Sequence, residues 1–321
     1  LDAGAVAEAV FSPLATTKPP QHVIILPDGP LWNIPFDLLY EAWEHRDGAP
    51  PVFRQSTSMS AIPGVRRGME PTEPELLAFA PDYAADNSNG ANERGGPRAI
   101  PLVSNRSEVD EITGLCSGKA YMGPDANELL FRRIAPQASV VHLAMHAFLD
   151  PLAPVSSYML FDVQSTDTVD GKLTIAEIHD LRLNADLAVL SACETGIGAQ
   201  EAGEGVNSLA RAFRYAGVPN TVSSLWKVDD RATKEIMVKF YEHLADGMGK
   251  ADALAEAKRW YRRTYPNEPP SKWAAFILIG DNEPVRLKKR SPVKPWMIVL
   301  GAIVLVGAAW AYRQRTSRKA A

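Results

Sequence analysis

Cysteine is scarce in this 321-residue chain, which holds only Cys116 and Cys193. Two cysteines are too few for a disulfide framework and are typical of a protein in a reducing compartment. No group of Cys or His has the spacing of metal ligands, so the sequence predicts neither a metal site nor a cofactor. The run "GMGK" at 247–250 lacks the spacing of a phosphate-binding loop. Residues 1–20 have no basic stretch ahead of their apolar residues and do not resemble a secretory signal.

Excess positive charge is also missing from most of the chain. The formal net charge is −4, and nine of the 34 basic residues lie after Glu283, where no acidic residue follows. The rest therefore carries 25 basic against 38 acidic residues. Because phosphate binding needs a basic face, no nucleic-acid partner is expected. With 46% hydrophobic residues, the chain is suited to burying a sizeable core.

Residues 296–312 form a run without any charge, "WMIVLGAIVLVGAAWAY". Aromatic residues stand at both ends and basic clusters lie outside them, which predicts a transmembrane helix, with a buried core helix as the alternative. Residues 283–295 are then a basic linker and residues 313–321 a basic tail. The flanking charges are balanced and give no orientation. Since only nine residues follow Tyr312, we expect a single-pass protein whose main domain faces the cytoplasm.

The remaining part, residues 1–282, alternates apolar strand-like runs with helix-like stretches. This pattern predicts an α/β fold in which a mostly parallel central sheet is flanked by helices on both faces. Strands are expected at 22–26, 76–80, 119–122, 140–144, 159–161, 187–191, 221–225 and 276–279. Helices are expected at 36–44, 108–116, 127–134, 173–179, 205–216, 230–246 and 250–264. Residues 81–101, rich in Asn, Gly and Pro, are predicted to be a surface loop within the domain.

Two of the predicted strands end in a reactive side chain. His146 follows one apolar run in "VVHLAMHAFLDP", and Cys193 follows another in "LAVLSACETGIG". Ligands bind beyond the carboxyl ends of parallel strands, where residues distant in sequence meet. A cysteine protease needs such a pair, a thiolate nucleophile and an imidazole that activates it and then protonates the leaving amine. By themselves the two residues are equally consistent with a structural histidine and a buried thiol.

Six separated segments resemble, in order and spacing, the CHAT family of caspase-like peptidases. They are "ILPDGPLWNIPFDLL", "VHLAMHAFLDP", "LAVLSACETGIG", "EGVNSLARAFRYAGVPNTVSSLWKVDDRAT", "FYEHLADGMGKADALAEAK" and "KWAAFILIG". The resemblance, over about residues 1–280, implies a caspase-like three-layer sandwich with a catalytic dyad of His146 and Cys193. It also implies an oxyanion site formed by the backbone N–H groups of Ala147 and Cys193. Prokaryotic origin, an upstream helical-repeat or sensor partner and a role in cell death or defence are further implications.

The segment around His146 departs from the family pattern. The family usually reads Ala-Thr-His-Gly where this chain reads Ala144-Met145-His146-Ala147. If the backbone after the histidine needs a positive φ, alanine is strained there and glycine is not. The leading hypothesis is a membrane-anchored cysteine endopeptidase that cleaves a protein or peptide substrate and is activated by a partner or by proximity. The departures motivate the alternative, a CHAT-fold signalling or assembly module that is catalytically weak or inactive.

Four further residues carry paired interpretations. Glu194 is either a recognition group for a basic substrate side chain or a loop hydrogen-bonding residue. Ser156 either borders the substrate cleft or serves an ordinary turn. Trp226 either lines the cleft or packs in the core. His142, on the same strand face as His146, is predicted to be a core or supporting residue and not a catalytic one.

Overall fold

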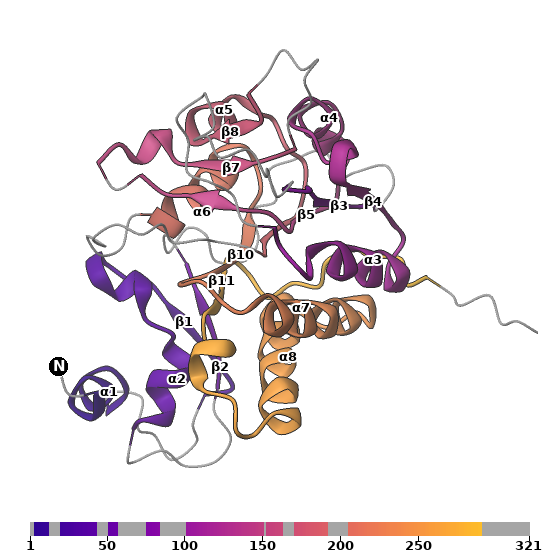
Figure 1. Ribbon diagram of the computed structural model, residues 1–321. Coiled ribbons are helices and arrows are strands. Elements are labelled where there is room, and N and C mark those ends of the chain that lie inside the picture. Colours follow the sequence, from indigo (N-terminus) through magenta and orange to yellow (C-terminus); the bar gives the residue numbers. More distant parts are fainter. Residues whose placement is uncertain are drawn as a thin grey trace, which may run out of the picture. The chain divides into compact units, whose positions relative to one another are not determined.

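Figure 1 shows a computed structural model of the chain. It describes residues 3–12, 20–43, 51–56, 75–83, 101–150, 152–162, 170–191 and 205–290. The chain divides into two compact units, Leu1–Lys289 and Arg290–Ala321. The predicted transmembrane helix at 296–312 and tail at 313–321 lie outside the described residues, as does linker segment 291–295. Within the described ranges, no helix has the length and apolar character needed to cross a membrane.

The centre of the first unit is an eight-stranded sheet, counted over the described residues. Its strands, in spatial order, are β1 (His22–Ile25), β2 (Val52–Gln55), β11 (Phe276–Ile279), β10 (Asn220–Ser224), β9 (Leu187–Leu190), β5 (Val140–Leu143), β3 (Leu76–Ala80) and β4 (Gly118–Met122). Neighbouring strands are parallel except at β10 and β11, which are antiparallel. The prediction of a mostly parallel central sheet is therefore confirmed. A second, antiparallel sheet joins β6 (Ala147–Phe148), β7 (Tyr158–Leu160) and β8 (Lys172–Thr174).

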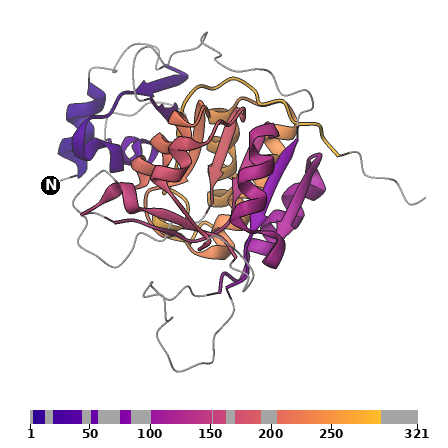
Figure 2. The same ribbon diagram turned by 90° about the horizontal axis from the view of Figure 1, so that it is seen from above.

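Helices cover both faces of the large sheet (Figures 1 and 2). On one face lie α3 (Asn105–Leu115), α7 (Asp230–Ala245) and α8 (Lys250–Thr264), and on the other α4 (Glu128–Ile134), α5 (Ile175–Asp180) and α6 (Gly205–Tyr215). Two further helices, α1 (Ala3–Phe11) and α2 (Phe36–Glu41), pack beside β1 and β2 through an aromatic cluster in which the rings of Phe11 and Tyr40 are 5.2 Å apart. This arrangement is the predicted three-layer sandwich.

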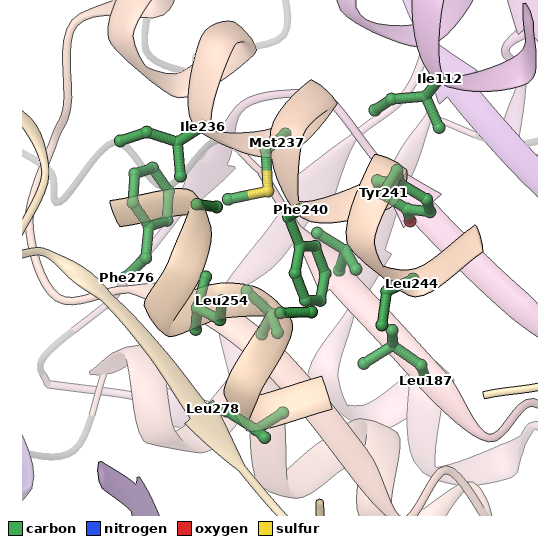
Figure 3. Packing of buried hydrophobic residues seen from close by; sticks show 14 of the residues in the cluster. Ile112, Leu187, Ile236, Met237, Phe240, Tyr241, Leu244, Leu254, Phe276 and Leu278 are labelled. Carbon is green, nitrogen blue, oxygen red and sulfur yellow. The ribbon is translucent and has the colours of Figure 1, made fainter. Parts of the chain in front are cut away.

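Strand β9 is apolar at every position because it is buried on both faces. Leu187 and Val189 belong to the cluster under α7 and α8, whereas Ala188 and Leu190 belong to the cluster under α5 and α6. A strand buried on both faces needs apolar residues at every position. Figure 3 shows Leu187 beside the α7 stripe, whose members include Ile236, Met237, Phe240 and Leu244. Burying each of these larger side chains stabilises the fold by about 1.5–3 kcal/mol.

Several element boundaries differ from the prediction for local reasons. The prediction missed β2, because its residues Arg54 and Gln55 are buried polar side chains that no apolar pattern reveals. The guanidinium of Arg54 donates a hydrogen bond to the carbonyl of Gly280, which makes its burial tolerable. Helix α5 begins at Ile175 and not at residue 173, because Thr174 and Glu177 form a capping box that fixes the start. The prediction also missed α1, β6 and β8.

Candidate active site

Three parallel strands, β5, β9 and β10, end side by side at one edge of the large sheet. His146 lies three residues beyond the end of β5, and Ser191 follows β9 directly. The N–H of Ser191 donates to the carbonyl of Leu143 at 3.1 Å, which joins the two strand ends. Cys193 is two residues further along the chain than Ser191. Cys193 and Glu194 lie outside the described residues, so the pairing of Cys193 with His146 stays a prediction.

His146 is almost completely buried and is held by Tyr83, a residue that the sequence analysis did not single out. The backbone N–H of His146 donates to the Tyr83 hydroxyl at 3.0 Å, and that hydroxyl donates to the carbonyl of Leu160 at 2.6 Å. The two rings lie 4.6 Å apart between centroids. The N–H of Leu160 in turn donates to the His146 carbonyl at 2.9 Å. The Tyr83 hydroxyl is thus inserted where two antiparallel strands would otherwise bond directly.

Ala147, the predicted oxyanion residue, begins β6 and pairs with Met159 of β7. In an antiparallel ladder, hydrogen-bonded pairs alternate with pairs that are not hydrogen-bonded. The neighbouring pair, His146 and Leu160, is hydrogen-bonded, so the Ala147 N–H points away from β7. No non-glycine residue among those described has a positive φ, so Ala147 is free of the strain considered above. Met145 is fully buried in the cluster under α4, α5 and α6, which explains an apolar side chain at that position.

A cleft opens at this edge of the sheet. It is lined by Leu102, Asn105, Glu108, Ala144, His146, Ser191, Ser224, Lys227, Val228, Asp230 and Thr233. These residues come from the ends of β5, β9 and β10, from the first turns of α3 and α7, and from the segments that precede those two helices. The lining combines a histidine, two carboxylates and hydroxyl groups, a set suited to binding a polar chain such as a peptide backbone. No group of three or more His, Cys, Asp or Glu residues in the part of the chain described could hold a metal ion.

The two other predicted substrate-binding residues that are described, Ser156 and Trp226, are not among the residues that line the cleft. Ser156 is exposed at the end of a short 3-10 helix, Pro154–Ser156, and its N–H closes a turn onto the carbonyl of Ala153. Trp226 is partly buried against the core, and its Nε1–H donates to the carbonyl of Ser271 at 2.8 Å. For both residues the contacts match the structural interpretation, and substrate binding by either one stays a prediction.

His142 and Cys116 are both buried and are not among the residues that line the cleft. His142 is fully buried, and its Nδ1 is 3.3 Å from the hydroxyl of Tyr241 on α7. His142 therefore occupies a core position, as predicted, and its supporting role stays a prediction. Cys116 is also fully buried, and burial raises the pKa of its thiol to about 11, although the charge of Lys289 opposes this rise. A thiol with that pKa is poorly suited to nucleophilic attack at neutral pH.

Comparison with solved structures defines the class of fold. The chain is similar to gingipain R of Porphyromonas gingivalis, an Arg-specific cysteine proteinase, with a TM-score of 0.52 and 8% identity. That match covers 88% of this chain and 67% of the other. It is also similar to the Saccharomyces cerevisiae separase–securin complex, with a TM-score of 0.50, 11% identity, and coverage of 85% of this chain and 16% of the other. Identities this low show the fold alone, which is the caspase-like α/β fold.

The chain belongs to the CHAT domain family, whose model matches residues 2–281. It is 26% identical over 302 aligned residues to human tetratricopeptide repeat protein 28 and 24% identical to the mouse protein of the same name. These alignments cover 82% of this chain but only 12% of each relative, so the chain spans a small part of the curated relatives it matches.

Proposed function

We propose that this protein is a caspase-like cysteine endopeptidase with His146 as the base and Cys193 as the nucleophile. The observation that carries the proposal is the position of His146. It is buried beyond β5, lines the cleft together with Ser191, and is held through its backbone by the Tyr83 hydroxyl. Similarity in fold to a cysteine proteinase supports the same chemistry.

The proposed reaction is acyl transfer to the thiol. His146 takes the proton from Cys193, and the sulfur attacks the scissile carbonyl to give a tetrahedral oxyanion. The N–H groups of Ala147 and Cys193 donate to that oxyanion, a role for which the Ala147 N–H is suited because it points away from β7. Collapse breaks the C–N bond as His146 protonates the leaving amine. Water, deprotonated by His146, then hydrolyses the thioester and restores the thiol.

A peptide-cleavage comparison tests this proposal, and the chain supplies a matched control. Purified wild type, Cys193→Ala and Cys116→Ala are incubated with a degenerate peptide library, and new termini are identified by mass spectrometry. The proposal expects cleavage by wild type and by Cys116→Ala, and none by Cys193→Ala. Cleavage that persists in Cys193→Ala at the wild-type rate rules out the assigned nucleophile.

The proposed setting is the cytoplasmic face of a membrane in a prokaryotic cell, in a signalling, cell-death or defence pathway. Membrane attachment rests on the apolar run at 296–312 and its basic flanks, which lie outside the described residues. A helical-repeat partner or activator is supported by the relatives, which are named as tetratricopeptide repeat proteins.

A second candidate function is a signalling or assembly module of the same fold without turnover. The sequence Met145-His146-Ala147, which departs from the family pattern, favours it. Cleavage that begins only when Met145→Thr and Ala147→Gly are introduced together would establish this second candidate over the first.

A further inference from the structure

A buried carboxylate, Glu108, lies directly behind the ends of the two strands that lead to the dyad. It stands in the first turn of α3, and only 3% of its surface is exposed. A buried carboxylate is destabilising unless nearby donors or cations compensate its charge. Its position near the helix N-terminus favours the negative charge. The remaining compensation comes from the polar groups that its Oε1 atom meets.

Those groups belong to β9 and β5. The hydroxyl of Ser191, the residue after β9, donates a hydrogen bond to Glu108 Oε1. Nε2 of His142, on β5, lies 3.0 Å from the same oxygen, although the angle is not that of a well-formed hydrogen bond. Behind His142, burial raises the pKa of Tyr241 well above its usual range, so its hydroxyl keeps its proton and can donate to Nδ1. One carboxylate oxygen therefore contacts both strands.

The same turn of α3 also holds the backbone of the strand ends. The side-chain Nδ2 of Asn105 donates to the carbonyl of Pro81, just beyond β3, at 2.9 Å. It also lies within hydrogen-bonding distance, 3.4 Å, of the carbonyl of Ala144, just beyond β5. Asn105 and Glu108 together thus contact the ends of three neighbouring strands, β3, β5 and β9. Both side chains are buried and both line the cleft.

We infer that Glu108 is a positioning residue for the dyad, a conclusion that rests on the proposed peptidase function. Its carboxylate fixes Ser191, two residues before Cys193, and His142, four residues before His146, in one arrangement. Glu108 acts through these two residues and takes part in no bond-making step. A displacement of a catalytic group by about 1 Å costs on the order of 100-fold in rate. The contacts of Glu108 with Ser191 and His142 are therefore expected to affect kcat.

The test compares Glu108→Gln with Glu111→Gln, an identical change three residues on, at an exposed position paired with Lys234. The Glu108→Gln variant keeps an acceptor for Ser191 but loses the charge facing His142. Peptide cleavage by Glu108→Gln is expected to show kcat lowered about 10- to 100-fold with KM within about twofold of wild type. Glu111→Gln is expected to match wild type in both. Ser191→Ala, which removes one bond and leaves the charge, is expected to lower kcat by a smaller factor.

Hydrogen exchange provides a readout that does not depend on catalysis. Glu108→Gln and Ser191→Ala are expected to speed exchange in peptides covering the ends of β5 and β9, whereas Glu111→Gln leaves it unchanged. Unchanged exchange at those ends, or unchanged kcat alongside a lowered melting temperature, overturns the inference. If wild type shows no Cys193-dependent cleavage, the proposed function fails, and exchange alone still decides whether Glu108 joins the two strands.

Discussion

The backbone N–H of His146 donates a hydrogen bond to the Tyr83 hydroxyl at 3.0 Å, and this hydroxyl bridges onward to Leu160. Tyr83 lies just beyond β3, whereas His146 precedes β6 and Leu160 ends β7. One hydroxyl therefore connects the large sheet to the small one at the place where the proposed base sits.

Tyr83→Phe keeps the ring beside His146 but removes the bridging hydroxyl. The His146 N–H and the Leu160 carbonyl then lose a partner in a largely buried place, which is expected to destabilise the fold by about 1–3 kcal/mol. Denaturant unfolding measures the change. Tyr121→Phe is the matched control, because Tyr121 stacks on Phe79 through its ring, and a change within about 0.5 kcal/mol is expected there. Equal, small effects at both positions would show that the bridge contributes nothing.

The thiol of Cys116 is predicted to be inert in the folded protein. Because burial raises its pKa to about 11, it remains protonated at neutral pH, and its thiolate grows only as the pH approaches that value. In Cys193→Ala, iodoacetamide at neutral pH should leave the native protein unmodified and should label one site after denaturation. Mass spectrometry of the intact protein counts the adducts. Rapid labelling of the native variant contradicts the burial of Cys116.

Lys250 is expected to be a major determinant of stability. It is fully buried at the start of α8, with Asp281 at 2.9 Å, Asp186 at 3.3 Å and the carbonyl of Glu283 at 2.6 Å. Lys250→Met leaves the partly exposed carboxylates of Asp186 and Asp281 without their buried cation and should cost about 1–3 kcal/mol in unfolding free energy. Lys119→Met, which breaks an exposed pair with Glu75, should cost less than about 1 kcal/mol.

The same cluster predicts loss of stability in acid. Partial burial raises the pKa of Asp281, but the charge of Lys250 and hydrogen bonds from its neighbours outweigh this, and the net pKa lies below the usual range. Its stabilising contribution is therefore complete above the unfolded pKa of about 3.9 and disappears as the pH falls through the lower folded value. Unfolding titrations between pH 6 and pH 2 should show this loss in wild type and a weaker one in Lys250→Met. Equal slopes in the two proteins would contradict the assignment.

Membrane attachment by residues 296–312 is predicted to be sensitive to a single charge. Leu305→Arg places a charge at the centre of the run and should disfavour insertion by about 3 kcal/mol. Flotation with lipid vesicles measures the bound fraction of the full chain. Gln314→Arg, which adds the same charge beyond the run, should float like wild type. The proposed anchor is contradicted if wild type does not float with the vesicles, or if Leu305→Arg floats as well as Gln314→Arg.

The sequence predicts the layers of the fold well because strands that are buried on both faces appear as runs of consecutive apolar residues. The apolar runs of β3 and β9, and the stripe of Ile236 and Phe240 on α7, place the sheet and its helices correctly. It fails where polar side chains are buried by tertiary partners. The burial of Arg54 in β2 is possible because its guanidinium donates a hydrogen bond to the carbonyl of Gly280, which lies 226 residues further along the chain.

The supporting residues of the site were hidden for the same reason. Glu108 meets Ser191 across 83 residues, and Tyr83 meets His146 across 63, distances over which no local pattern operates. One sequence feature could have pointed to Glu108. It lies four residues before Ile112 and therefore on the same helix face, which is the buried one. Tyr83 stands at the edge of the segment 81–101, whose composition indicates a surface loop.

The central claim is that His146 activates Cys193, and the rate of adduct formation tests it most directly. Wild type and His146→Ala are treated with an electrophilic peptide ketone, and the adduct is located by peptide mass spectrometry over time. We expect wild type to be modified at Cys193 and not at Cys116, and His146→Ala to react at least about 100-fold more slowly. Equal rates in the two proteins, or an adduct on Cys116, would contradict the account.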